Sequence, residues 1–297
     1  MVYEPMLDEI EQNSNGKIAF NIYPGGSLVP RSEQYDAVRN GTADMSTTYF
    51  ADVASLFPLY EVFTLPAAYE LTNDGEYLIQ TLGNRIFTIP DATEVLCFFQ
   101  QQPYYLYTSS KQVKTLDDMT GLKIVANTQL QQAVLTALGA VPIAMGQSEV
   151  YEATVKGIID GILATPAMID TYSLTEVYKY VLELTLGYNT GMINMNINTW
   201  TSLPDDLKTV VKEAVLKTGY SFVQQFNEDK AKVDGALIAS GGTVNTLTDE
   251  EQVLWVNVFK PVIDKWVADK SARGLPVTDL LNVIRVECRN LDIPFPY

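Results

Sequence analysis

The stretch that decides the fold is residues 114–166, KTLDDMTGLKIVANTQLQQAVLTALGAVPIAMGQSEVYEATVKGIIDGILATP. Short apolar runs at residues 122–125, 141–143 and 158–161 predict three strands. The segments between them have apolar residues at helical spacing and end at Gly139 and Gly157, so they predict two helices. Strands that alternate with helices in this way pair in parallel. The stretch therefore predicts an α/β fold.

The loops after two of these strands are the first places to expect a binding site. In open sheets of this kind, ligands bind at the carboxyl ends of the strands. Those ends lie after Val125 and after Leu163, and polar residues follow both. They are Asn127 and Thr128 in the first loop and Thr165 in the second. Helix capping is the alternative role for Asn127 and Thr128.

Short motifs occur in a fixed order along nearly the whole chain. In the central stretch they are Thr115-Leu116-x-Asp118-Met119-x-Gly121-Leu122-Lys123-Ile124, Leu138-Gly139-Ala140-x-Pro142 and Glu149-Val150-Tyr151. Outside it they include Tyr23-Pro24-Gly25-Gly26-Ser27-Leu28, Asn40-Gly41-Thr42-Ala43-Asp44-Met45 and Trp200-x-x-Leu203-Pro204. Each motif is weak alone, but the ordered set is specific. With it, the chain resembles the solute-binding proteins of TRAP transporters, the DctP-like family.

This resemblance implies a two-lobed periplasmic-binding-protein fold with hinge crossings and a long helix that spans both lobes. We expect residues 1–101 with about 191–230 in lobe one, and 102–190 with about 231–297 in lobe two. The long helix is expected from Pro204 to about Ile238. Family members normally have one more strand before the first helix, and this strand is absent here. Residues 17–23 alternate in polarity and predict a strand of lobe one.

Charge and composition argue against several classes of function. The chain has 36 acidic residues, 20 basic residues, a net charge of −16 and no histidine. The negative charge disfavours nucleic acid or an anionic membrane surface as a partner. Without histidine, histidine-dependent triads and histidine metal sites are ruled out. We expect no cofactor, no bound metal and no catalytic residue.

Two further observations concern the compartment and the cysteines. Cys97 and Cys288 are the only cysteines, and Cys97 lies in an apolar run that reads as a buried strand; a disulfide is the alternative. No apolar run approaches the roughly 20 residues of a membrane span. The N-terminus lacks the pattern of a signal peptide. The periplasmic location that we expect therefore comes from the resemblance alone.

The chain departs from the family where a ligand carboxylate is usually held. The resemblance implies an arginine directly after the Gly-Leu-Lys-Ile motif, but this chain has Val125 there. Many members have a second arginine on the preceding strand, which corresponds to residues 104–107, Tyr-Tyr-Leu-Tyr. Arginine suits a two-point grip on a carboxylate. Its absence here favours a small neutral or aromatic-bearing solute, although backbone amides are able to bind an anion.

Tyrosine, threonine and asparagine side chains suit such a solute because they combine apolar surface with hydrogen-bonding groups. The predicted ligand-binding residues are Thr47, Tyr49, Tyr105, Tyr107, Val125, Asn127, Thr128, Thr165, Tyr188 and Asn189. Core packing is the alternative for Tyr105 and Tyr107.

The sequence thus predicts an extracytoplasmic solute-binding protein of a TRAP-type transporter. We expect a monomer that captures a small organic solute and delivers it to membrane subunits. The resemblance implies an organic acid, whereas the missing arginine suggests a neutral or aromatic solute. A ligand-sensing module and an enzyme on a two-lobed scaffold are the alternatives. The sequence contains no glycine-rich phosphate loop, no Gly-x-Ser-x-Gly motif and no acidic metal cluster, so we expect no enzymatic activity.

Overall fold

The computed structural model describes residues 3–66, 72–86, 92–293, 295 and 297. The chain divides into two compact units, each built around a sheet of its own. Unit one comprises residues 1–63, 71–101 and 189–225, and unit two comprises 64–70, 102–188 and 226–297. The predicted α/β class is confirmed. The lobe boundaries expected from the sequence stay a prediction.

Unit one contains a three-stranded sheet in the order β1-β8-β2. Its elements are α1 (Tyr3–Asn13), η1 (Pro24–Gly26), η2 (Arg31–Glu33), α2 (Gln34–Arg39), β1 (Met45–Tyr49), η3 (Tyr60–Thr64), α3 (Asn73–Ile86), β2 (Thr93–Pro103), β8 (Tyr188–Asn196), α7 (Ile197–Ser202) and the first part of α8 (Asp205–Ala239). β1 and β8 are antiparallel, with Tyr49 opposite Gly191. The 35 residues of α8 confirm the long helix predicted after Pro204.

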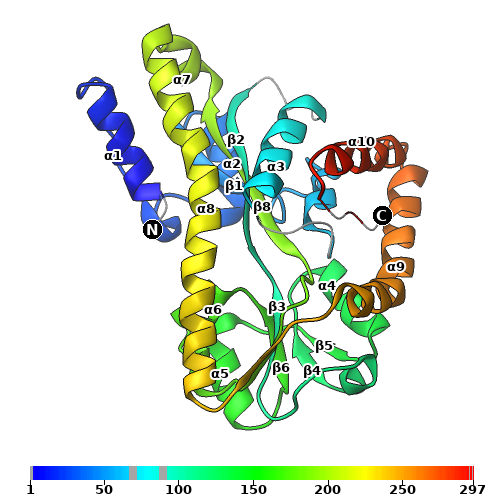
Figure 1. The fold of residues 1–297 in the computed structure, drawn as a ribbon. Helices are drawn as coiled ribbons and strands as arrows, with labels where there is room; N and C mark the ends of the chain where they lie inside the picture. The colour runs from blue at the N-terminus through cyan, green and yellow to red at the C-terminus, as the bar shows by residue number, and fades with distance from the viewer. Residues whose placement is uncertain (1–2, 67–71, 87–91, 294, 296) are drawn as a thin grey trace. The chain divides into compact units, whose positions relative to one another are not determined.

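One face of this sheet packs against α1 and α8, which lie side by side in Figure 1 (blue and yellow-green). Met6 and Ile10 of α1 and Val215 and Phe222 of α8 are buried in the same cluster as Phe99 of β2. The Phe99 and Phe222 rings stack with their centroids 5.0 Å apart. This packing fixes the strand ends of unit one against two helices.

Residues 17–23, which the sequence predicts as a strand, form none. A strand needs a neighbour to accept its backbone hydrogen bonds. Among the described residues, β1 pairs with β8 alone, so nothing joins residues 17–23 to the sheet. The backbone amides of Ile18 and Phe20 donate instead to Ser14 Oγ at 3.1 Å and to Glu11 Oε1 at 3.0 Å. Local hydrogen bonds thus replace the ladder that the alternating pattern predicts.

Unit two contains a six-stranded sheet in the order β5-β4-β6-β3-β7-β9. Its elements are β3 (Tyr105–Thr108), η4 (Leu116–Met119), β4 (Lys123–Val125), α4 (Gln129–Ala137), β5 (Val141–Ile143), α5 (Gln147–Val155), β6 (Gly161–Ala164), α6 (Pro166–Thr171), η5 (Leu174–Glu176), β7 (Tyr180–Leu182), the rest of α8, β9 (Thr243–Asn245), α9 (Asp249–Ala272) and α10 (Val277–Asn290). β4 is parallel to β5 and to β6, with Ile124 opposite Pro142 and Gly161. These pairings confirm the predicted parallel unit.

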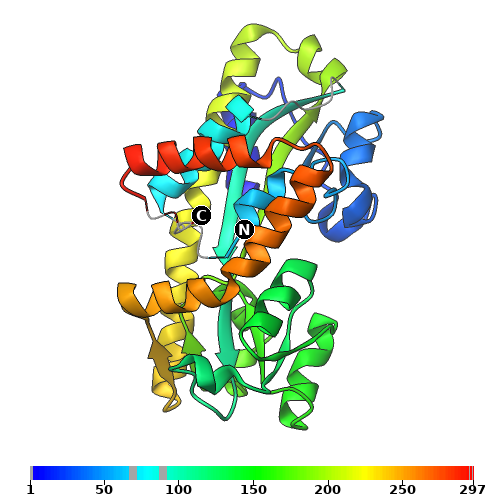
Figure 2. The same cartoon turned by 90° about the vertical axis from the view of Figure 1, so that its right-hand side faces the viewer.

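Two short strands of unit two have no clear signal in the sequence. Residues 174–180 form one turn (η5) and the start of β7. β7 pairs with β3 and with β9, and both strands are distant in sequence. β7 and β9 have three residues each, too few to show a period, and they form because these tertiary partners are present. In Figure 2 the orange helix α9 bends along its length, and Pro261 lies inside it.

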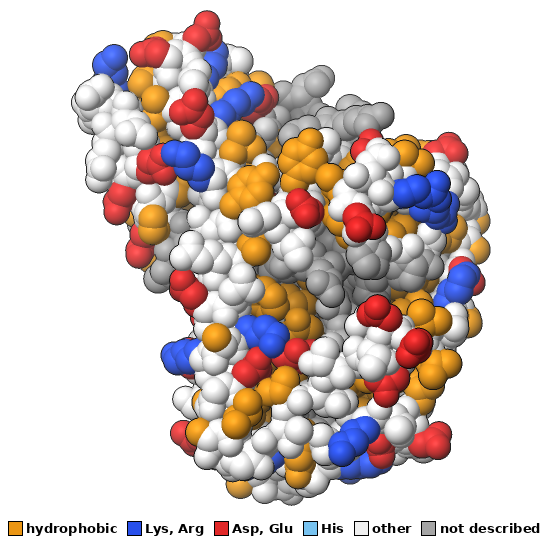
Figure 3. All heavy atoms as spheres, viewed as in Figure 1, with side chains coloured by type: hydrophobic (Ala, Val, Ile, Leu, Met, Phe, Trp, Pro, Cys, Tyr) orange, Lys and Arg blue, Asp and Glu red, His pale blue; other side chains and the backbone are white. Residues whose placement is uncertain are grey.

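The described residues place both cysteines in the interior. Cys97 of β2 and Cys288 of α10 are buried and free, so Cys97 is the buried strand residue that the sequence predicts. Acidic and basic side chains are interspersed on the face shown in Figure 3. Among the described residues, none of the helices combines the length and apolar character needed to cross a membrane.

Candidate functional site

Three polar side chains meet where β1, β2 and β8 of unit one lie side by side. Asn189 Nδ2 donates to Gln101 Oε1 at 3.1 Å. Gln101 Nε2 in turn donates to the Tyr49 hydroxyl at 2.9 Å. The hydroxyl of Tyr3, from α1, lies 3.4 Å from that of Tyr49. The antiparallel register that sets Tyr49 opposite Gly191 places Asn189 two residues further along, on the same face of the sheet.

Arg31 covers the ring of Tyr49. Its guanidinium carbon is 4.0 Å from the ring centroid, and its Nε donates to Asp52 Oδ2 at 2.5 Å. A guanidinium over an aromatic face gains a cation–π attraction, and the carboxylate fixes its orientation. We call Tyr3, Arg31, Tyr49, Gln101 and Asn189 the Tyr49 cluster.

The protein around the Tyr49 cluster is only partly open to solvent. Tyr3 packs edge-on against Phe222 at 5.8 Å, and Tyr49 packs edge-on against Phe99 at 5.8 Å. Burial and the neighbouring Tyr49 hydroxyl raise the pKa of Tyr3, while a hydrogen bond from Thr47 opposes this. Tyr3 is therefore a neutral hydrogen-bonding group at any physiological pH. Thr47 lies on the same face of β1 as Tyr49.

In unit two, Asn127 joins two neighbouring loops at the carboxyl ends of β4 and β5. Its Nδ2 donates to the Met145 carbonyl at 3.1 Å, and its Oδ1 accepts from the Met145 amide at 3.1 Å. Both ends of the amide are thus used in bracing the backbone. This arrangement is not helix capping, the alternative that the sequence left open for Asn127.

Thr128 and Thr165 each cap a helix. The Thr128 hydroxyl accepts from the Gln131 amide at 3.2 Å at the start of α4, so capping is its structural role. The Thr165 hydroxyl accepts from the Met168 amide at 3.2 Å at the start of α6. Each cap satisfies one of the free N–H groups of the first helical turn. Contact of Asn127, Thr128 or Thr165 with a solute stays a prediction.

Three other predicted residues are buried. Tyr107 and Val125 belong to the core of unit two, and Tyr188 is also buried at the start of β8. Burial raises the pKa of the Tyr107 phenol, as do the charges of Asp234 and Glu183. Tyr105 is half-buried, and its ring centroid lies 6.3 Å from that of Phe226. Tyr107 therefore packs in the core, which is the alternative role that the sequence left open for it.

Three members of the Tyr49 cluster are not among the residues predicted from the sequence: Tyr3, Arg31 and Gln101. Gln101 carried a usable signal, because it lies at the polar end of an apolar strand and alternates with the buried Phe99. Arg31 carried none. It is the first residue of the short turn η2, and only the tertiary fold brings it over a residue 18 positions later in the chain.

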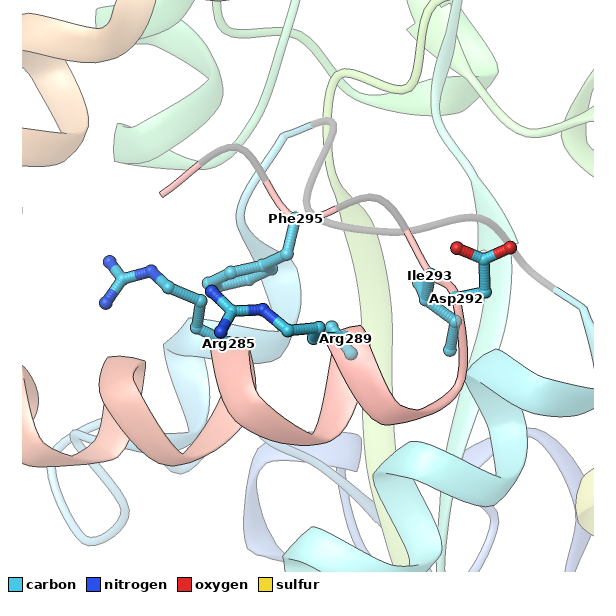
Figure 4. Close-up of a pocket in the computed structure, with 6 residues that line it drawn as sticks. Arg285, Arg289, Asp292, Ile293 and Phe295 are labelled. Atoms are coloured by element: carbon cyan, nitrogen blue, oxygen red, sulfur yellow. The ribbon is translucent and has the colours of Figure 1, made fainter.

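A shallow pocket of about 380 Å³ lies elsewhere in unit two, at the end of α10. Figure 4 shows its residues, among them Arg285, Arg289 and Phe295. The Nε and Nη2 atoms of Arg285 both donate to the Tyr297 carbonyl, at 2.9 and 2.7 Å. Those donors are therefore occupied by the chain itself.

Among the described residues there is also no group of three or more histidine, cysteine, aspartate or glutamate side chains placed to hold a metal ion.

The motifs and the fold agree with a comparison to known families. The profile of the DctP family, described as "Bacterial extracellular solute-binding protein, family 7", matches residues 2–270. The chain belongs to this family. Family 7 contains the solute-binding proteins of TRAP transporters, which bind small solutes and deliver them to membrane subunits. The resemblance seen in the sequence is thereby confirmed.

Individual family members are distant but align over most of the chain. The C4-dicarboxylate-binding periplasmic protein DctP of Rhodobacter capsulatus is 27% identical over 263 residues, which cover 86% of this chain and 78% of that protein. A TRAP solute-binding protein of Rhodoferax ferrireducens, solved with copurified benzoate, is 25% identical, with a TM-score of 0.81 and coverage of 98% and 92% of the two chains. A TRAP periplasmic protein of Ochrobactrum anthropi has a TM-score of 0.87 at 22% identity, with coverage of 98% and 90%. These similarities confirm the predicted periplasmic-binding-protein fold class.

Proposed function

We propose that this family 7 protein is a periplasmic, monomeric, non-enzymatic solute receptor that captures a small organic acid carrying an aromatic ring. We further propose that the two lobes expected from the sequence correspond to units one and two.

The observation that carries the solute class is the Tyr49 cluster. It combines a tyrosine ring, a guanidinium and two side-chain amides at one end of a sheet. Aromatic faces pack against rings, and amides and guanidinium donate to oxygen atoms. The benzoate found in the Rhodoferax ferrireducens relative has this chemistry. On this proposal the solute is an acid, in place of the neutral solute that Val125 favoured in the sequence, and it binds without the family arginine.

The test is a thermal-shift screen of the purified chain against acid and amide pairs: benzoate with benzamide, 3-hydroxybenzoate with 3-hydroxybenzamide, and succinate with succinamide. A bound solute at about a hundred times its Kd stabilises a protein by about 2.7 kcal/mol. We expect the aromatic acids to give the largest shifts and to be recovered unchanged. Turnover of a bound compound, or a larger shift with succinate than with any aromatic acid, would contradict the proposal. Size-exclusion chromatography with light scattering tests the monomer.

A further inference from the structure

Arg31 is held in place by two different contacts within unit one. Its Nε donates to Asp52 Oδ2 at 2.5 Å, and its guanidinium lies 4.0 Å from the centroid of the Tyr49 ring. A long side chain normally loses considerable rotamer freedom when it binds a ligand. Here the aspartate and the tyrosine already restrict that freedom. Arg31 is therefore organised before any solute arrives.

The contact with Asp52 leaves part of the guanidinium unused. A guanidinium has five N–H donors, and its two terminal nitrogens form a fork that matches the two oxygens of a carboxylate. Asp52 takes the Nε position. Neither terminal nitrogen of Arg31 has a hydrogen-bond partner within the described part of the chain. The side chain of Arg31 is 51% exposed, so this fork is open to solvent.

Two other arginines of the chain differ in this respect. Arg39, also in unit one, pairs through its Nη2 with Asp36 Oδ1 at 3.0 Å. Arg285, in unit two, uses Nη1 for Asn282 and its other two nitrogens for the Tyr297 carbonyl. In both, a terminal nitrogen is engaged by the protein. Arg31 differs from these two because, within the described residues, its guanidinium makes a polar contact through Nε alone.

We propose that Arg31 is the residue that grips the carboxylate of the solute, in the role that the family gives to the arginine replaced by Val125. The inference rests on the proposed function and adds the binding residue to it. The Tyr49 ring shields one face of the guanidinium from water, which strengthens its attraction for an anion. Gln101 keeps one amide N–H, and Asn189 keeps its carbonyl oxygen, beyond the hydrogen bonds they share. These groups suit a hydroxyl on the same solute, as in 3-hydroxybenzoate.

The experiment measures how strongly each variant prefers an acid to its amide. Calorimetric Kd values for benzoate and benzamide, and for 3-hydroxybenzoate and its amide, are compared in the wild type, Arg31→Gln, Arg31→Lys and Arg39→Gln. Arg39→Gln is the matched control, since it removes an equal charge from an exposed arginine of the same unit. The unliganded melting temperature and circular dichroism of each variant check folding.

We expect Arg31→Gln to weaken binding of the acids by about 10- to 100-fold, the range for a charged two-point hydrogen bond, with little effect on the amides. Arg31→Lys keeps the charge but loses the two-nitrogen fork. Its preference for acids over amides should therefore lie between that of the wild type and that of Arg31→Gln. Arg39→Gln should keep the wild-type preference. If Arg31→Gln does not fold, the acid-to-amide ratio of Arg31→Lys carries the test.

Two results overturn the inference in distinguishable ways. A wild type that prefers acids, with Arg31→Gln and Arg31→Lys unchanged in that preference, refutes the role of Arg31 and leaves the proposed function standing. A wild type that binds amides as well as acids, or binds neither, refutes the proposed solute class, and the role of Arg31 with it.

Discussion

Gly219 of α8 lies directly against the buried carboxylate of Glu76. A Cβ atom at position 219 would come within 2.2 Å of Glu76 Oε1 and 2.3 Å of Gln80 Nε2. Gln80 Nε2 donates to Glu76 Oε1 at 2.8 Å, and the Gln100 amide donates to Glu76 Oε2 at 3.2 Å. The glycine thus makes room for a polar contact between α3, β2 and α8 inside unit one.

Gly219→Ala is therefore expected to destabilise the protein. The added methyl group must displace Glu76 or Gln80, and either movement breaks a buried hydrogen bond, at a cost of about 1–3 kcal/mol. Chemical denaturation at pH 6 measures the change. Gly235→Ala is the matched control, since it lies in the same helix with no atom within 4 Å of the new Cβ. The control should be neutral or stabilise by up to about 1 kcal/mol. Equal effects at both positions would refute the steric argument.

Glu76 should make the stability of the protein fall as pH rises. Burial is the largest cause that raises the pKa of its carboxyl, to about 7, against the hydrogen bonds from Gln80 and Gln100. An acid whose pKa is raised by folding has no penalty below its unfolded pKa, near 4.5, and an increasing penalty up to its folded pKa.

Glu76→Gln should remove this loss, which amounts to at most about 3 kcal/mol between pH 4.5 and pH 7. The free energy of unfolding, measured by urea denaturation from pH 4 to pH 8, should fall less steeply in the variant than in the wild type. Glu4→Gln, on the exposed side of α1, serves as the control. Parallel profiles for the wild type and Glu76→Gln would show that Glu76 does not titrate in this range.

In unit two, Lys230 forms ion pairs with the carboxylates of both Glu183 and Asp234. Its Nζ pairs with Asp234 Oδ2 at 2.7 Å and also with Glu183, whose second oxygen accepts from the Thr246 hydroxyl at 3.2 Å. Burial raises the pKa of Glu183 while Lys230 lowers it. Lys230→Met leaves both acids without a cation and should cost about 2–3 kcal/mol at pH 8.

The loss in Lys230→Met should be smaller at pH 5, because the pKa of Glu183 then rises further and protonation relieves the repulsion. Lys232→Met is the control, because Lys232 pairs with Asp170 on the surface, where an ion pair contributes at most about 1 kcal/mol. The free energy of unfolding of Lys230→Met and Lys232→Met, measured by chemical denaturation at pH 8 and pH 5, tests this prediction. A pH-independent loss would mean that packing, and not charge, is what Lys230 provides.

Asn127 should respond differently to two substitutions. Asn127→Ala loses both hydrogen bonds to Met145 and is expected to cost about 1 kcal/mol, since the bonds are exposed. Asn127→Asp places a carboxylate oxygen against the Met145 carbonyl and should cost more at pH 7. Below about pH 4 the protonated acid donates to that carbonyl, and the loss should shrink. Gln129→Glu adds the same charge nearby without touching Met145, and thermal melts of the three variants should separate charge from bonding.

The sequence by itself determined those features that depend on neighbours in the chain. The parallel unit of β4, β5 and β6 follows from apolar runs and glycine stops. The cap of α9 follows from Thr248 and Glu251, whose side chains exchange hydrogen bonds with each other's backbone amides, at 3.3 and 2.8 Å. Such contacts span three or four residues, so their pattern can be read directly from the chain.

Only the tertiary structure decided where residues distant in sequence meet. Residues 17–23 have the alternation of a strand, but a strand forms only beside a partner, and the described residues provide none. Tyr49, Gln101 and Asn189 are linked because three strands pair in one sheet, and Arg31 joins them from the short turn η2. Tyr107 and Val125 have the same residue types as a binding site would need, yet the packing of unit two buries them. Burial and long-range pairing arise from the whole fold, whereas hydrophobic period and capping are local.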